Sequence, residues 1–162
     1  MTPLEVGVWY SLPGIPNVVI SLQKTSDFLA YPEWITQRNT KQRATKKSVI
    51  DHLRKLFPTH HIVGLGKLTK DDEWEDGTKY SAGTIWRLDA NTRSYLWESG
   101  KTDRIPENVL CVMYLEDSLI KLRRTYWTFD NPTAAEVAAE VVTGCQKSLC
   151  LLYTSPSPRD CQ

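Results

Sequence analysis

The stretch of residues 84–97 limits the fold of this chain more than any other, because it predicts a buried strand that runs directly into a helix. Leu96 and Trp97 follow Arg93 by three and four residues, which is the spacing of one face of a helix. Residues suited to a buried strand recur at every second position before the junction: Tyr80, Ala82, Thr84, Trp86 and Leu88. A fold for this chain must therefore join a strand to a helix through the polar cluster between them.

This polar cluster has the sequence Asp-Ala-Asn-Thr-Arg, from Asp89 to Arg93. A helix leaves the N–H groups of its first turn without intrahelical acceptors, and its positive dipole end attracts anions. We expect Thr92 to cap the helix and Arg93 to bind a phosphate or carboxylate through two parallel hydrogen bonds. The alternative is an ordinary capped helix with an arginine on its surface.

The predicted elements after residue 60 alternate between strands and helices, which is typical of the α/β class. A strand at 61–68 precedes the junction and an apolar strand at 109–115 follows it, with an acidic hairpin loop at 71–77. The sequence therefore predicts a single α/β domain with a small mixed sheet flanked by helices.

Further helices and strands are predicted on either side of this central part. Two short strands are expected at 6–10 and 18–22, and an amphipathic helix at 43–57 that stops before Pro58. Helices are also expected after a capping Asp117, and from a capping box at Thr133 and Glu136 as far as Gly144. The helix after Asp117 is expected to pack inward through Leu119, Ile120, Leu122, Tyr126 and Trp127. Four tryptophans are expected in the core: Trp34, Trp86, Trp97 and Trp127.

A polar segment, Gln37-Arg38-Asn39-Thr40, precedes the first long helix, and Thr128-Phe129-Asp130-Asn131 ends the helix after Asp117. Together with the Asp-Ala-Asn-Thr-Arg turn, this order resembles the ParB/sulfiredoxin-like superfamily over roughly residues 34–144, especially the short ParB-like proteins of bacteriophages and mobile elements. The resemblance implies a turn that binds nucleotide phosphate. It assigns phosphate or nucleotide contacts to Gln37, Arg38, Thr40, Asn91, Thr92 and Arg93.

The turn departs from the pattern of that family at two places. It has Ala90 where the family has glycine, which adopts positive φ more easily. It has Asn91 and Thr92 where sulfiredoxins carry the cysteine of their peroxiredoxin-repair chemistry, so we do not expect that activity.

The resemblance divides the chain into an N-terminal extension with short strands at 1–33, a ParB-like core domain at 34–148 and a tail at 149–162. The tail resembles a translated sequencing adapter, and its Ser/Pro content predicts disorder. In that family a DNA-binding helix-turn-helix often follows the core. The resemblance therefore allows for such a domain beyond the end of this sequence.

Basic residues crowd the segment between Gln37 and Lys55, in which Asp51 is the only acid. Such a run releases counterions from nucleic acid and steers association, although a solvated helix face has the same composition. We expect DNA as the partner, with Arg43, Lys46 and Lys47 in contact with it. A second basic cluster can extend this face: Lys121, Arg123 and Arg124.

Two functions remain open at this point. The first is a DNA-associated ParB-like protein that binds nucleotide or nucleic-acid phosphate at the strand-to-helix turn. The second is a nuclease or nucleotide hydrolase on the same scaffold, in which Asp89 binds a divalent ion or orients water. The corresponding cofactors are a nucleoside triphosphate and Mg²⁺. Mg²⁺-dependent turnover of nucleotide or DNA would distinguish the second function from the first.

Composition narrows the class of protein. The formal net charge is only +1, and no segment approaches the roughly 18 apolar residues of a membrane span. The first residues do not resemble a secretory signal, so we expect a cytoplasmic protein without a membrane partner. The spacing of the four cysteines matches no zinc or redox motif, the histidines form no ligand pattern, and we expect no protein metal site.

Overall fold

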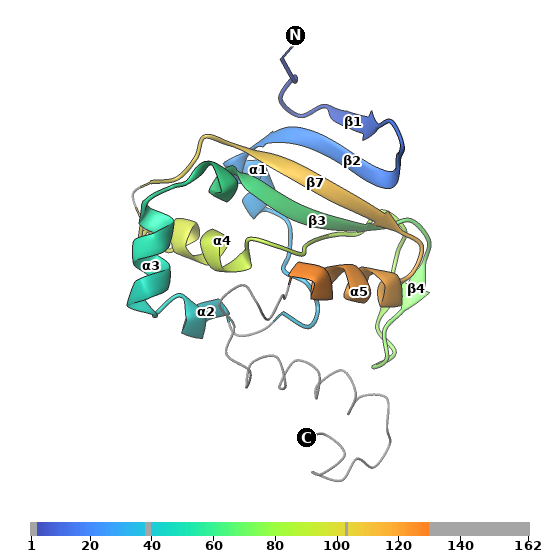
Figure 1. Cartoon of the computed structure of the whole chain (residues 1–162). Helices are drawn as coiled ribbons and strands as arrows, with labels where there is room; N and C mark the ends of the chain where they lie inside the picture. Colours follow the sequence, from blue (N-terminus) through green and yellow to red (C-terminus); the bar gives the residue numbers. More distant parts are fainter. Residues whose placement is uncertain (1–2, 38–39, 103, 130–162) are drawn as a thin grey trace.

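The computed structural model describes residues 3–37, 40–102 and 104–129, and its centre is a five-stranded sheet (Figure 1). The strand order is β1-β2-β7-β3-β6. β3 and β7 run parallel and the other neighbouring pairs run antiparallel, so the sheet is mixed, as predicted. The strands span β1 (Trp9–Leu12), β2 (Ile15–Lys24), β3 (Ile62–Leu68), β6 (Ile85–Arg87) and β7 (Asn108–Glu116). A separate hairpin joins β4 (Asp72–Glu73) to β5 (Lys79–Tyr80), so part of the segment 71–77 that was predicted as a loop is a strand.

The N-terminal strands occur near their predicted positions and belong to the central sheet. β2 pairs with β7 from Val18↔Tyr114 to Lys24↔Asn108. It is longer than predicted, from Ile15 to Lys24, and its buried polar residues Ser21 and Gln23 are joined by a 2.7 Å hydrogen bond. Residues before position 34 thus form one sheet with the later strands.

The helices gather beside this sheet. Figure 1 shows α2, α3 and α4 at one end of it and α5 next to β3. α4 follows β6 within four residues, which confirms the predicted strand-to-helix junction. The helical segments are α1 (Thr25–Leu29), α2 (Thr40–Arg43), α3 (Lys47–Arg54), a 3₁₀ turn η1 (Pro58–His61), α4 (Asn91–Glu98) and α5 (Leu119–Phe129).

The helix predicted at 43–57 is present as α3 but is shorter than predicted, because it spans only Lys47–Arg54 and the separate α2 precedes it. After α2 the backbone tightens into a turn, in which Lys46 N–H donates to the Arg43 carbonyl and Lys46 adopts an extended conformation. The turn buries Ala44 completely against Leu53 and Leu96. Burial of this alanine overrides the helical pattern of the sequence.

Glycines in β3 let α5 lie close to the sheet. A Cβ atom at Gly66 would lie 2.7 Å from side-chain atoms of Leu88 and Leu122, and one at Gly64 would lie 2.9 Å from Phe129. The close approach packs α5 against Trp34, Trp86 and Leu68 in one apolar cluster. α1 and α4 pack into a second cluster around β3 and β7, which includes Phe28, Val63, Trp97 and Cys111.

Three expectations for α5 and its start are wrong. Ile120 and Trp127 lie on the exposed face of α5, with 47% and 43% of their surface accessible, because the inward stripe is occupied by Leu119, Leu122 and Tyr126. Asp117 does not cap the helix but forms an ion pair with Lys121. The N–H of Leu119 instead donates to Asp72 Oδ2, from the hairpin of β4.

Some predicted elements fall outside the described residues. They are the helix expected from Thr133 to Gly144 and the tail at 149–162. Among the described residues no helix is long and apolar enough to cross a membrane.

Candidate functional site

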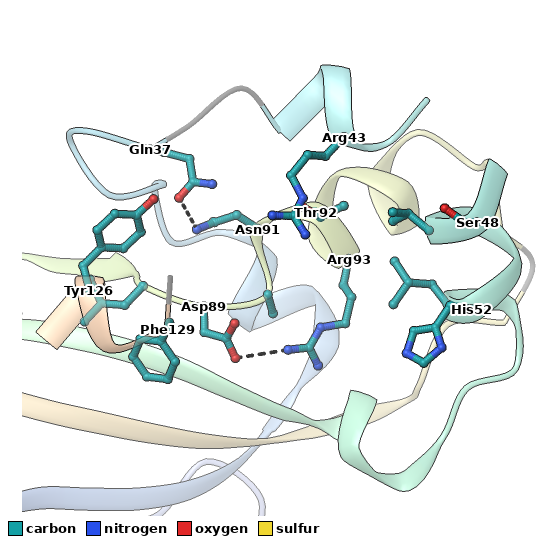
Figure 2. A pocket seen from close by; sticks show the side chains of 14 residues that line it. Gln37, Arg43, Ser48, His52, Asp89, Asn91, Thr92, Arg93, Tyr126 and Phe129 are labelled. Carbon is teal, nitrogen blue, oxygen red and sulfur yellow. Dashed lines mark hydrogen bonds and ion pairs between the residues drawn. The ribbon is translucent and has the colours of Figure 1, made fainter. Parts of the chain in front are cut away.

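A pocket of about 550 Å³ opens where α2, α3, α5 and the junction before α4 meet (Figure 2). It brings together residues that the sequence predicted as one site but that lie more than fifty positions apart, from Gln37 to Arg93. The predicted residues in its wall are Gln37, Arg43, Asp89, Asn91, Thr92 and Arg93. The other lining residues are Ser48, Val49, His52, Leu53, Leu88, Ala90, Tyr126 and Phe129.

The junction turns into α4 at Ala90. This residue has φ 66° and ψ 19°, the left-handed conformation that the usual glycine of such a turn adopts easily. α4 therefore begins at Asn91, and Ala90 is its N-cap without a side-chain hydrogen bond. The prediction that Thr92 caps the helix is wrong, because Thr92 already lies inside the first turn.

The first turn of α4 leaves three N–H groups at the pocket wall. Ser94 is the first residue whose N–H bonds within the helix, to the Ala90 carbonyl at 2.8 Å. In the described part of the chain, the N–H groups of Asn91, Thr92 and Arg93 have no hydrogen-bond acceptor. The start of α4, which carries the positive end of the helix dipole, thus lies in the pocket wall without a capping side chain.

A chain of amide and hydroxyl groups ties α2 to this turn. Asn91 Nδ2 donates to Gln37 Oε1 at 2.8 Å and to the Arg87 carbonyl at 3.3 Å, and Gln37 Nε2 donates to Thr40 Oγ1 at 3.2 Å. These bonds fix the orientation of the Asn91 amide. Its Oδ1 is buried and has no hydrogen-bond donor among the described residues.

Arg93 is held by the protein itself. Its Nη1 donates to the carbonyls of His60 and Ile62 at 2.7 and 3.0 Å, and its Nη2 donates to Asp89 Oδ2 at 3.1 Å. The side chain is only 13% exposed. Burial lowers the pKa of this guanidinium, and the Asp89 carboxylate opposes that shift. Arg93 therefore joins the start of α4 to the start of β3, and Figure 2 shows its side chain directed towards Asp89.

Asp89 lines the pocket and is 36% exposed. Its carboxylate faces Arg93, so its charge is balanced within the protein. In the residues that the structure describes, no three His, Cys, Asp or Glu side chains gather in a way that can hold a metal ion.

Beside the pocket lies a pair of histidines, His52 and His60, that the sequence did not predict. His60 Nδ1 accepts the N–H of Phe57 at 3.1 Å, so the proton of a neutral His60 ring lies on Nε2, 3.3 Å from Nε2 of His52. Burial lowers the pKa of His60 from the ordinary 6.5, and the charges of Arg93, His52 and His61 lower it further. His52 lines the pocket, whereas His60 does not.

The predicted basic residues separate in the structure. Arg43 lines the pocket and is half-buried, while Lys46 and Lys47 are exposed at the start of α3 and do not line it. Thr40 is buried behind Gln37, and Arg38 lies outside the described residues. The sequence also missed the aromatic wall of Tyr126 and Phe129, because helical spacing predicts core packing and cannot show that a core residue borders a pocket.

Comparison with known proteins identifies no relative: no family model, no curated protein and no solved structure matches this chain.

Proposed function

We propose that the pocket binds the phosphate of a nucleotide, with the ligand seated on the first turn of α4. The observation that carries this proposal is the uncapped helix start: three adjacent N–H groups without acceptors among the described residues, at a left-handed Ala90, in the wall of a pocket. Backbone N–H groups at the positive end of a helix dipole form a binding site for anions.

Charge in the pocket supports the same ligand. Arg43 lies across from Thr92 in Figure 2 and brings a positive charge to the helix start. The carboxylate of Asp89 is paired with Arg93, which weakens its repulsion of an anion. A phosphate seated here receives N–H bonds from one side and a guanidinium from the other.

The rest of the pocket suits the remainder of a nucleotide. A volume of about 550 Å³ lies within the usual range for small-molecule sites. Tyr126 and Phe129 offer aromatic rings to a base or sugar.

We further propose that this protein is of the ParB/sulfiredoxin-like type and associates with DNA. Support comes from the mixed α/β sheet, from a strand-to-helix turn at the predicted position and from Gln37 beside Asn91, the two segments that the resemblance assigns to one pocket. An enzymatic role, in which Asp89 binds Mg²⁺ and the chain hydrolyses nucleotide or DNA, requires Asp89 to exchange its contact with Arg93. Product formation with Mg²⁺ is therefore a separate readout of the test.

Calorimetric titration of the full chain with nucleoside triphosphates, with and without Mg²⁺, tests the proposal. Thr92→Pro removes one N–H donor at a position where the first turn of a helix tolerates proline, and Thr92→Ala is its control because it keeps the N–H. Arg43→Gln removes the opposing charge, and Lys79→Gln removes the same charge from exposed β5.

We expect Thr92→Pro and Arg43→Gln each to weaken binding by about tenfold, the equivalent of one charge-assisted hydrogen bond. Thr92→Ala and Lys79→Gln should bind as the unmodified protein does. The proposal is wrong if the unmodified protein binds no triphosphate, or if both pocket variants bind as their controls do.

A further inference from the structure

A second depression lies at the far end of α3, and we call it the basic hollow. It has a volume of about 640 Å³ and is lined by Arg54, Lys55, Gly100, Lys101 and Arg104. Arg54 and Lys55 end α3, and the other three residues follow α4. Among the described residues, which leave out Asp103, every ionisable side chain that lines the hollow is a cation.

The charged groups of the hollow are presented to solvent. All four basic residues are exposed. The Nζ atoms of Lys55 and Lys101 lie 5.9 and 5.4 Å from the ring centres of Phe57 and Tyr95, so two of the long side chains rest against aromatic rings. The nearest described acid contact is weak, because Asp51 lies 3.9 Å from Arg54 and both side chains are at least half exposed.

Helix stability explains part of this arrangement. Cations near the C-terminus of a helix are favourable, and Arg54 and Lys55 lie at the end of α3. Lys101 lies two residues beyond Ser99, the C-cap of α4. Arg104 is further from any helix end. The helix dipole also does not explain why cations from two different helices surround the same hollow. A bound anion would explain why these four positive charges lie together.

We infer that the basic hollow binds the phosphate backbone of duplex DNA. Its lining offers charge and no aromatic ring, so it recognises phosphates and not bases. The net charge of the whole chain is only +1, so attraction to DNA must come from a local cluster of this kind and not from the overall charge. Each lysine or arginine that contacts a phosphate releases a counterion, which makes the binding salt-dependent.

The hollow is a site distinct from the pocket, and the inference rests on the proposed association with DNA but not on the ligand of the pocket. α3 lines the pocket through His52 and Leu53 and the hollow through Arg54 and Lys55. α4 presents its first turn to the pocket, while the hollow lies beyond its other end, roughly 12 Å away for eight residues of helix.

Fluorescence anisotropy of a labelled short duplex, measured between about 50 and 200 mM salt, tests this inference on the full chain. The variant Lys101→Gln/Arg104→Gln removes two charges from the hollow, and Lys24→Gln/Lys79→Gln removes two exposed charges from the sheet and the hairpin. Circular dichroism checks that each variant is folded. If the first variant does not fold, Arg54→Gln/Lys55→Gln replaces it.

We expect the hollow variant to bind the duplex at least about tenfold more weakly at low salt, and its log–log salt slope to fall by about 1 to 2. The control variant should change neither quantity. Nucleotide binding in the pocket should be the same in both, so loss of DNA binding with retained nucleotide binding separates this inference from the proposed function. The inference is overturned if the hollow variant equals its control, or if the unmodified protein binds tripolyphosphate but no duplex.

Discussion

Replacing Arg93 with alanine removes the contacts that fasten the start of α4 to β3. The guanidinium donates to the carbonyls of His60 and Ile62 at 2.7 and 3.0 Å, and each bond from a charged donor contributes about 1.5 kcal/mol. The ion pair with Asp89 adds less than about 1 kcal/mol, because its carboxylate is 36% exposed and screened by solvent. We expect Arg93→Ala to lower the free energy of unfolding by about 3 kcal/mol.

Urea denaturation followed by circular dichroism measures this loss. With a slope of about 2 kcal/mol per molar urea, the midpoint should fall by roughly 1.5 M. Arg93→Lys should recover part of the loss, since one ammonium cannot reproduce the fork of bonds. Arg54→Ala is the matched control, because the Arg54 side chain is 58% exposed. We expect this substitution to lower the free energy of unfolding by less than about 0.5 kcal/mol. If Arg93→Ala is no more harmful than Arg54→Ala, Arg93 does not have the structural role described above.

Two further predictions concern the surroundings of the pocket. Because the pKa of His60 is lowered in the folded state, the unfolded chain binds more protons below about pH 6.5, and the free energy of unfolding should fall as the pH drops from there towards the folded pKa. His60→Asn, which keeps an acceptor for the Phe57 N–H, should reduce this pH dependence in denaturation curves; an unchanged slope would show that His60 does not cause it. Gly66→Ala should cost about 1–3 kcal/mol, because its Cβ would lie 2.7 Å from Leu88 and Leu122 and push α5 from the sheet. A thermal melt identical to that of the unmodified protein would contradict this packing.

The alternation of strands and helices could be predicted from the sequence, and so could the place of the strand-to-helix junction. Trp86 and Leu88 before the junction and Leu96 and Trp97 after it are all buried. Burial does not alternate along the strand, because Arg87 is buried as well. The break between α2 and α3 could not be predicted, since it depends on burial of Ala44 against α4, a contact between distant segments.

The candidate site was predictable only in part: the structure brings Gln37 and Asn91 to 2.8 Å of one another, but Lys46 and Lys47 do not line the pocket, and its aromatic residues Tyr126 and Phe129 were missed. The direction of Arg93 was not predictable, because its carbonyl acceptors come from η1 and β3, whose position relative to α4 is a property of the folded chain. The start of α4 was misplaced because Ala90, which is not a usual left-handed residue, adopts that conformation here.

An amide NMR titration of the ¹⁵N-labelled full chain with a nucleoside triphosphate tests directly whether phosphate binds at the start of α4. We expect the largest shifts at the N–H groups of Asn91, Thr92 and Arg93, which gain an acceptor, with smaller shifts at Gln37 and Arg43. Lys101 and Arg104 in the basic hollow should shift little with the same nucleotide at moderate salt. If the amides of the first turn of α4 do not move while the nucleotide binds elsewhere, or if no amide moves, the pocket is not a phosphate site.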